Sequence, residues 1–305
     1  MKVPIMKRGN VTGNRILIIN ADDLGYARGI NQAIQECSVA GILRSATLMA
    51  NAPAFDDAVA MVRANPELDA GVHLVLTKLP PLASPSKIGG LAAEGGHLPA
   101  TPWELLLAVH RGRVSRSAIR QELTCQLTKV FDHGLRPTHL DSHKHVHLIP
   151  EVLEVVIELA RQFAIPWVRN PFDETPFLPP ALQVDRERFS TFCTQHLKGR
   201  LVRYYRSTHQ RLLAGSGVRV PDHFFGVSLT GIWNKAAMIG LMSRLPPGIT
   251  EWMLHPGTCD EDLLRSGTRL RERRVVEKAL LLAPEMPEHL KRQGIILSSF
   301  RAEAA

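Results

Sequence analysis

The sequence predicts an α/β protein built as a single TIM-like (β/α) barrel, and three observations support this fold class. Short apolar segments alternate with segments of helical length along most of the 305 residues. This alternation implies right-handed crossovers and a parallel sheet, and seven or eight strands close such a sheet into a regular or irregular barrel. An open doubly wound sheet would carry a glycine-rich phosphate turn after its first strand, but Asp22, Asp23, Leu24 and Gly25 occupy that place.

The first three strands are predicted at residues 15–20, 44–50 and 70–76. The first of these is apolar and rich in isoleucine, which is typical of a parallel strand buried on both faces. Helices are predicted between the strands at residues 29–40 and 54–64. The first helix ends at Gly41, which suits a left-handed cap, and the second ends before Pro66.

Residues 78–100 break this rhythm with prolines and paired glycines, so we expect a long loop that acts as a lid. Two helices are predicted after it, at about 102–111 and 115–132. A short strand at 138–141 then runs into a histidine-rich segment, and Pro150 starts a helix that extends to about residue 163.

The second half of the chain contains the remaining predicted strands, at 167–169, 223–228, 250–254 and 295–300. Helices are predicted at 233–244 and at about 261–282. Residues 171–222 form an insertion after the fifth strand. We expect residues 1–305 to form one domain that includes this insertion.

The composition indicates a cytoplasmic globular protein. Apolar residues make up 45% of the chain and charged residues 22%, which excludes wholesale disorder. No apolar stretch approaches the roughly 18 residues that a membrane helix needs, and the N-terminus does not read as a secretory signal. The four cysteines lie far apart and form no CxxC pair, so we expect reduced thiols rather than a disulfide framework.

The net charge of +8 is concentrated in the insertion. Residues 185–219 contain eight arginines and lysines but only two acidic residues, with apolar residues between them. This pattern is typical of a helix that lies on an anionic membrane, and equally of a solvated helical face. No helix-turn-helix, zinc-finger or RNA-recognition signature accompanies the charge, so we expect no nucleic-acid partner.

Reactive residues gather at the predicted carboxyl ends of strands. One cluster holds four histidines within nine residues: His139, His143, His145 and His147. Such clusters bind metals because neutral imidazole offers a lone pair near neutral pH. The reactive residues at or after strand ends are Asp22, Asp23, His73, His143 and His255. Barrel enzymes place their active sites at this face, so we expect these side chains to share one pocket.

These residues describe metal-assisted hydrolysis. Asp22 and Asp23 are neighbours that point in different directions, so one is expected to bind metal and the other to act as a base. A metal held by one carboxylate and two imidazoles keeps open positions for a water nucleophile, and another histidine can protonate a departing amine. His143, His145 and His147 are two residues apart, so on a strand all three side chains would face the same side. Spacing alone therefore does not decide which of them binds the metal.

Five stretches resemble the YdjC-like family, which includes chitooligosaccharide deacetylase and the hopanoid-biosynthesis-associated deacetylases. They extend over most of the chain and comprise residues 18–25 (IINADDLG), 45–51 (SATLMAN), 71–77 (GVHLVLT), 137–147 (PTHLDSHKHVH) and 251–257 (EWMLHPG). Leu24 stands where many members carry phenylalanine, an apolar exchange that changes no catalytic residue. The insertion looks like that of the longer, hopanoid-associated members.

The resemblance implies a role for each reactive residue. By this resemblance Asp23, His73 and His143 hold one divalent metal. Asp22 is then the general base, and His255 is the acid for the leaving group. The family implies a barrel-like fold, a homodimer, N-acetylated amino sugars as substrates and magnesium as the metal. The ligand types themselves favour zinc, cobalt or manganese.

Three further residues are candidates for substrate contact or for support of the ligands: Asp141, His145 and Arg169. Asp141 is expected to orient His143, to contact a sugar hydroxyl or to cap a turn, and Arg169 either faces the pocket or pairs on the surface. The basic insertion would suit an amino sugar attached to a lipid, held while the protein sits on the inner membrane. A metal-dependent phosphoesterase and a non-catalytic carbohydrate-binding relative remain as alternatives.

Overall fold

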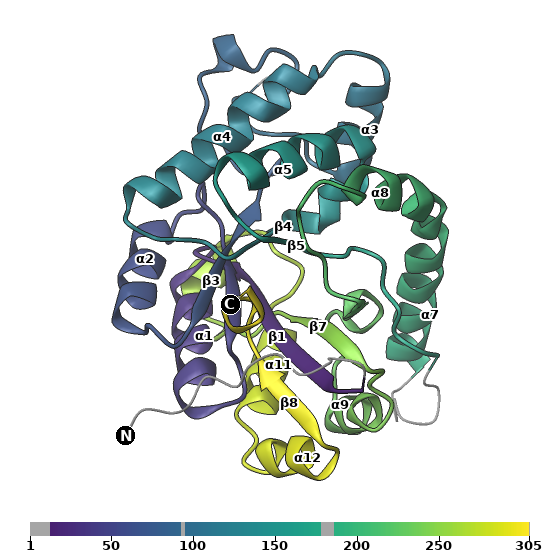
Figure 1. The fold of residues 1–305 in the computed structure, drawn as a ribbon. Coiled ribbons are helices and arrows are strands. Elements are labelled where there is room, and N and C mark those ends of the chain that lie inside the picture. Colours follow the sequence, from purple (N-terminus) through teal and green to yellow (C-terminus); the bar gives the residue numbers. More distant parts are fainter. Residues whose placement is uncertain (1–12, 93–94, 178–185, 305) are drawn as a thin grey trace.

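The computed structural model of this protein describes residues 13–92, 95–177 and 186–304. Their strands form one parallel sheet with the order β5-β4-β3-β2-β1-β7-β6, and β8 also pairs with β1 (Figure 1). The strands are β1 (Arg15–Leu24), β2 (Ser45–Leu48), β3 (Asp69–Leu74), β4 (His139–Ser142), β5 (Trp167–Val168), β6 (His223–Phe225), β7 (Gly248–Leu254) and β8 (Ile295–Ser298). Because every pair is parallel, all carboxyl ends lie at one end of the sheet.

Strand β1 pairs with three other strands. β7 pairs with it from Arg15 to Ala21. The opposite edge is shared, because β8 pairs with β1 as far as Ile18 and β2 pairs with it from Asn20 onward. Seven strands therefore make up the curl of the sheet. The prediction of a TIM-like barrel is confirmed in its irregular, seven-stranded form.

The two ends of the curl, β5 and β6, are linked without a regular ladder in the described residues. The backbone of Arg219, just before β6, forms a parallel bridge with Trp167 of β5. It accepts from the N–H of Val168 and donates to the carbonyl of Pro166. The N–H of Glu174, after β5, also donates to the carbonyl of Phe224 in β6, so two backbone contacts join the ends of the curl.

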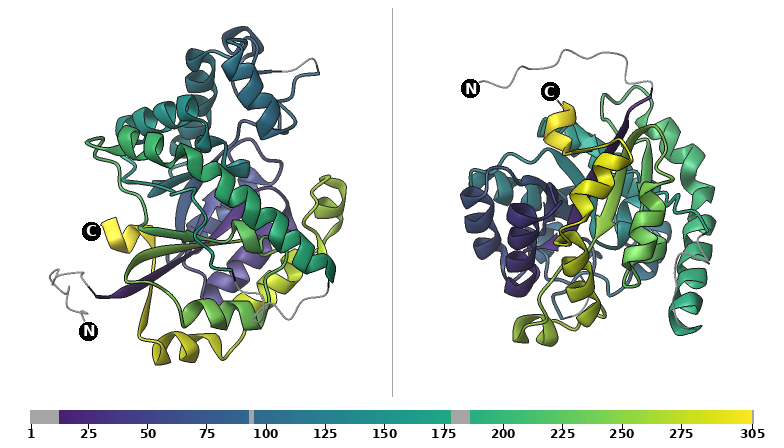
Figure 2. Two further views of the ribbon diagram at one scale, coloured as in Figure 1. Left: turned by 90° about the vertical axis from the view of Figure 1, so that its right-hand side faces the viewer. Right: turned by 90° about the horizontal axis from the view of Figure 1, so that it is seen from below.

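Helices surround the strands, as the view from below shows (Figure 2). The helices outside the insertion are α1 (Arg28–Ala40), α2 (Phe55–Ala64), α3 (Pro102–His110), α4 (Arg116–Asp132), α5 (Pro150–Gln162), α9 (Lys235–Met242), α10 (Glu261–Arg265), α11 (Glu272–Leu281), α12 (Met286–Arg292) and α13 (Phe300–Ala304). The starts of α3 and α4 are set by side-chain caps, since the hydroxyls of Thr101 and Ser115 accept from backbone N–H groups three residues on.

Several predicted elements need correction. The helix predicted at 261–282 is two helices, α10 and α11, and Gly267 between them has a left-handed φ of 66° that ends a regular helix. Helix α12 was not predicted. The strand predicted at 223–228 stops at Phe225, because Gly226 has a φ of 142° and the chain turns into the 3-10 helix η4 (Val227–Leu229).

The histidine-rich segment also differs from its prediction. Residues 143–148 do not extend β4 but form the 3-10 helix η2 (His143–Leu148), in which Lys144 and His145 are left-handed. The argument from strand parity was therefore wrong for His145 and His147. Their side chains leave the backbone in directions that a strand would not give.

The insertion contains α7 (Arg186–Leu201), η3 (Val202–Tyr205) and α8 (Arg206–Leu213). Helix α7 packs against η4, and α8 packs against α5. The loop predicted at 78–100 holds one short 3-10 helix, η1 (Pro85–Lys87), and buried Glu122 of α4 accepts from the backbone N–H groups of Leu82 and Ala83. Within the described residues, no helix is both long enough and apolar enough to span a membrane.

Candidate active site

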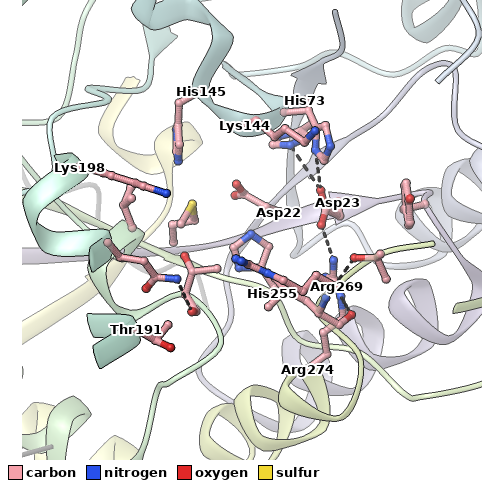
Figure 3. Close-up of a pocket in the computed structure, with 18 of the residues that line it drawn as sticks. Asp22, Asp23, His73, Lys144, His145, Thr191, Lys198, His255, Arg269 and Arg274 are labelled. Atoms are coloured by element: carbon pink, nitrogen blue, oxygen red, sulfur yellow. Dashed lines mark hydrogen bonds and ion pairs between the residues drawn. The ribbon is translucent and has the colours of Figure 1, made fainter. Parts of the chain in front are cut away.

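A pocket of about 600 Å³ lies at the carboxyl ends of the strands. Its lining includes all five reactive residues that were expected to meet: Asp22, Asp23, His73, His143 and His255. Figure 3 labels four of them, Asp22, Asp23, His73 and His255. They come from β1, β3, η2 and the end of β7, so they are brought together only by the curl of the sheet. Parallel topology explains why groups more than 200 residues apart share one cavity.

The two neighbouring aspartates both reach the pocket because β1 is irregular at this point. The register between β1 and β2 shifts between Ala21 and Leu24, and Asp23 has a φ of 67°. A left-handed aspartate is strained, and such strain collects at functional sites. Of the five described non-glycine residues with positive φ, four line this pocket: Asp23, Lys78, Lys144 and His145.

Asp23, His73 and His143 form a group that fits a metal ion. One carboxylate oxygen, Oδ1 of Asp23, lies 3.5 Å from Nε2 of His73 and 3.4 Å from Nδ1 of His143. Two atoms that bind one ion at about 2.1 Å with tetrahedral geometry lie about 3.4 Å apart. Burial lowers the pKa of His143, so its ring is neutral and offers a lone pair. The donor set therefore fits a divalent cation.

Asp141 supports this group by orienting His73. Its Oδ1 lies 2.7 Å from Nδ1 of His73, which turns Nε2 toward Asp23, and Thr47 donates to its other oxygen at 3.0 Å. Such a carboxylate fixes the tautomer of a ligating imidazole. Asp141 was expected to orient His143, but the histidine that it contacts is His73. Burial disfavours a protonated His73, but Asp141, Asp22 and Asp23 outweigh it and raise the pKa to about 9, so the site favours a cation.

Arg169 lies beneath the pocket and is 1% exposed, so it neither lines the cavity nor pairs on the surface as expected. Its guanidinium contacts both oxygens of Asp22 at 2.7 Å, Oδ2 of Asp141 at 2.7 Å and Oε1 of Glu251 at 2.7 to 2.8 Å. Three buried carboxylates thus share one cation. Burial raises the pKa of Glu251 to about 7, against the pull of Arg169.

Asp22 and His255 differ in charge. Burial opposes ionisation of Asp22, but the contact with Arg169 outweighs burial and holds the pKa of Asp22 well below its usual range. Burial lowers the pKa of His255 to about 4, against the attraction of Asp23 and Asp22. Near pH 7 the substrate-free pocket therefore contains an ionised Asp22 and a neutral His255, whose Nδ1 has no hydrogen-bond partner.

Two residues of α11 complete the site and were missed in the sequence. Arg274 donates to Oδ2 of Asp23 at 2.5 Å and lines the pocket. Glu277, one turn further along, accepts from the backbone N–H of His255 at 2.6 Å and from that of Gly231 at 3.2 Å. The sequence of α11 is typical of an ordinary charged helix, so no local signal could have singled out either residue.

The other histidines of the cluster take separate places. His145 lines the pocket, and its buried Nδ1 has no hydrogen-bond partner. His147 turns away from the cavity, since its Nδ1 lies 2.5 Å from Oγ of Ser142. His139 lies on β4 behind the pocket, within hydrogen-bond distance of Asn20.

Helix α7 of the insertion forms one wall of the pocket. Its lining residues recur at helical spacing, and they are Ser190, Thr191, Thr194, Gln195 and Lys198. Gln195 donates to the carbonyl of Thr230, while its buried Oε1 has no partner. These polar side chains suit the hydroxyl and amide groups of a sugar. They could not be predicted as site residues, because the sequence did not place the insertion next to the cavity.

A second cavity of about 540 Å³, here called the side groove, adjoins the pocket. Most of its lining is apolar and comes from α3, η2, α7 and η3, and it includes Trp103, Leu106, Leu148, Ile149, Leu201 and Tyr205. Lys144, His145 and Lys198 line both cavities. The polar pocket and the apolar groove are therefore contiguous.

The chain is similar to proteins of known family. The model of a family described as YdjC-like protein matches residues 16–292. A carbohydrate deacetylase from Geobacillus stearothermophilus is 34% identical over 288 residues, which span 94% of this chain and 97% of that protein. A chitooligosaccharide deacetylase from Klebsiella pneumoniae is 40% identical over 152 residues, which span 50% of this chain and 58% of that protein.

The fold is also similar to that of a solved structure. It is an Enterococcus faecalis protein provisionally described as a cellobiose-phosphate cleavage protein. The two folds superpose with a TM-score of 0.72 at 25% sequence identity, over 95% of this chain and 99% of the other. The irregular barrel is therefore shared over most of the chain.

Proposed function

This chain belongs to the YdjC-like protein family, and from that membership we propose that it is a metal-dependent carbohydrate N-deacetylase. It would hydrolyse the amide bond of an N-acetylated amino sugar by attack of an activated water. Relatives named as carbohydrate and chitooligosaccharide deacetylases support this activity. The observation that carries the proposal is the group Asp23, His73 and His143 at a pocket that also holds an ionised carboxylate and a neutral histidine.

Asp23, His73 and His143 would hold one divalent cation. When bound, such an ion lowers the pKa of a coordinated water and polarises the amide carbonyl of the substrate. The ligand types favour zinc, cobalt or manganese, and the family resemblance favours magnesium. Asp22 and Asp141, which with His73 make a second potential ligand group, are already neutralised by Arg169. This favours one ion per chain over the several ions of a phosphoesterase.

Asp22 and His255 would share the proton transfers. Asp22 is ionised and faces the pocket, so it can accept the proton of the attacking water. His255 lines the same pocket and is neutral near pH 7, so it would receive this proton from Asp22. His255 can then protonate the nitrogen as the C–N bond breaks. The proton of the water thus ends on the amine, and its oxygen ends in acetate.

The remaining candidate residues would act on the sugar or on these groups. We propose that His145 contacts the sugar, because its buried and unpartnered Nδ1 belongs to a residue of the pocket wall. Asp141 would hold His73 in the orientation that binds metal, and Arg169 would hold Asp22. Neither Asp141 nor Arg169 lines the cavity, so we assign neither to substrate contact.

The substrate would be an oligosaccharide or a glycolipid that contains N-acetylglucosamine. The side groove favours the glycolipid, because an apolar group linked to a sugar in the pocket could enter the groove past Lys198. Exposed Leu197, Leu201 and Tyr204 lie in the basic segment 185–219. We propose that this face contacts the inner membrane from the cytoplasm.

We also propose that the chain forms one domain and assembles as a homodimer, as the family resemblance implies.

The decisive experiment measures acetate release from monomeric, oligomeric and lipid-linked N-acetylglucosamine, with metal content determined on the same preparation. We expect acetate release with one metal per chain, and the highest kcat/KM for a substrate with an apolar group. Phosphate release from phosphoesters together with more than one metal per chain would favour the phosphoesterase. Tight sugar binding without any acetate release would favour a binding protein.

A further inference from the structure

His139, like His147, has no part in the chemistry described above, yet it is tightly enclosed. Its side chain is 1% exposed, and its ring stacks on Phe300 with 4.0 Å between centroids. On another side the ring fills the space beside Gly71, where a Cβ would lie 2.6 Å from ring atoms. The ring therefore has one orientation, and Gly71 is the residue that permits it.

Both ring nitrogens of His139 have partners. Nε2 lies 3.0 Å from Oδ1 of Asn20, and Nδ1 lies 2.9 Å from Oγ1 of Thr138. An amide oxygen can only accept, so Nε2 carries a proton and donates it to Asn20. Burial and the charge of Arg169 hold the pKa of His139 well below its usual range, which keeps the ring neutral with a single N–H.

Asn20 connects His139 to the pocket. Its Nδ2 donates to Oδ1 of Asp22 at 3.0 Å and to Oγ1 of Thr47 at 3.2 Å. If the amide turned over, its oxygen would face the Asp22 carboxylate and its NH₂ group would face the N–H of His139. The contact with the carboxylate would be repulsive, because an ionised Asp22 can only accept. Asp22 thus sets the amide orientation, and the N–H of His139 holds the opposite, oxygen end of the amide in place.

We propose that His139 is a positioning residue for Asp22: through Asn20 it fixes the third hydrogen bond to the Asp22 carboxylate and so the direction in which that carboxylate faces the pocket. Arg169 already binds both oxygens of Asp22, but its guanidinium also serves Asp141 and Glu251. Asn20 supplies a restraint from another direction. The inference rests on the proposed function only where it takes Asp22 as the proton acceptor.

Two substitutions of His139 separate positioning from packing. In His139→Gln the terminal nitrogen is as many bonds from Cα as Nε2 is in histidine, so the donor to Asn20 is kept. In His139→Asn the nitrogen matches Nδ1 instead, and this donor is lost. We expect His139→Asn to lower kcat about 100-fold, with KM and metal content unchanged, because a misplaced catalytic group costs about this much. We expect His139→Gln to stay within about threefold of the wild type. Equal kcat values for the two variants would overturn the proposal.

A double-mutant cycle tests the path through Asn20. If His139 acts through Asn20, then His139→Asn should lower kcat little further in an Asn20→Ala background. Independent, multiplying effects would overturn the proposal. Asn20→Ala alone gives the answer if His139→Asn does not fold, since wild-type kcat in that variant would also overturn it.

A second readout does not depend on turnover. The side-chain NH₂ protons of Asn20, followed by NMR, should exchange with solvent slowly in the wild type and in His139→Gln. They should exchange faster in His139→Asn. The same slow exchange in all three proteins would refute the inference, whereas absence of acetate release from the wild type would refute only the proposed function.

Discussion

At the scale of residues, the site depends on how each buried carboxylate is neutralised. Asp22 and Asp23 are adjacent in sequence, but Asp22 faces Arg169 whereas Asp23 faces Arg274 and two imidazoles. The left-handed backbone of Asp23 makes this division possible. The sequence predicted two different roles for the pair from their adjacency, and the structure adds the partners that would enforce those roles.

Replacement of Asp22 tests its assignment as the base. Asp22→Asn keeps the volume and one acceptor oxygen but removes the charge, so metal content should equal that of the wild type. We expect kcat to fall about 10²- to 10⁴-fold, the range that general-base catalysis supplies. Acetate release and metal content on the same samples decide this. A kcat within tenfold of the wild type would contradict the assignment.

Replacement of His73 tests the metal group. His73→Ala removes one of three ligands and the imidazole that contacts Oδ1 of Asp141, so we expect the purified protein to lose its metal and its activity. His145→Ala is the matched control, because His145 lies in the same pocket but outside the ligand group. Metal analysis after dialysis is the measurement. Full metal content in His73→Ala, or its loss in the control, would be inconsistent with this group.

At the scale of elements, the insertion is the part whose function the sequence described least well. Its basic and apolar composition was visible, but its contribution of a polar wall through α7 and an apolar groove through η3 was not. Helix α7 reaches the site because it packs against η4, which follows β6. Composition predicts what a surface segment can contact, but only packing decides which cavity it borders.

Substitutions in the side groove test the substrate class. Trp103→Ala and Leu201→Ala should each lower kcat/KM about tenfold for an N-acetylglucosamine glycoside with a long alkyl group, because burial of one large apolar side chain contributes about 1.5–3 kcal/mol. The same variants should act normally on an unsubstituted oligosaccharide. Val39→Ala, an exposed apolar residue on α1, is the control. Equal losses on both substrates would argue against the groove as the site for the apolar group.

At the scale of the whole molecule, the interior holds many histidines that stay neutral. Burial is the first cause of the lowered pKa of His139, His145, His147 and His255, which falls to about 3 for His145 and about 4 for His255. In the unfolded chain these rings take up protons near pH 6.5. The stability that they contribute is therefore present above pH 6.5 and is lost as the pH falls.

Acidification should consequently destabilise the metal-free protein. Glu251 and Glu277 act in the opposite direction, because burial raises each pKa to about 7 and their contribution is lost as the pH rises from about 4.5 to 7. Four histidines outnumber these two glutamates, so the free energy of unfolding should fall between pH 6.5 and 5. Urea unfolding with a chelator measures this. In His147→Gln the free energy of unfolding should fall less over this pH range. A free energy of unfolding that stays constant or rises on acidification of the wild type would contradict the prediction.

By itself, the sequence determined the fold class, the order of most strands and the residues that the parallel topology gathers at one end. It could do so because apolar periodicity is local and because parallel strands share a carboxyl face. The family resemblance then chose His143 from a cluster in which spacing could not. The turn at 143–148 shows why spacing failed, since the predicted strand ends there and the backbone becomes left-handed.

Only the tertiary structure decided which groups neutralise and orient the reactive residues. Arg169 lies 147 residues from Asp22, Arg274 lies 251 residues from Asp23, and Asp141 lies 68 residues from His73. Such contacts leave no trace in local periodicity, because they depend on the curl of the sheet and on the packing of α11 against α1. The charges around this pocket are therefore a property of the fold, although the residues that we propose to carry the chemistry are visible in the sequence.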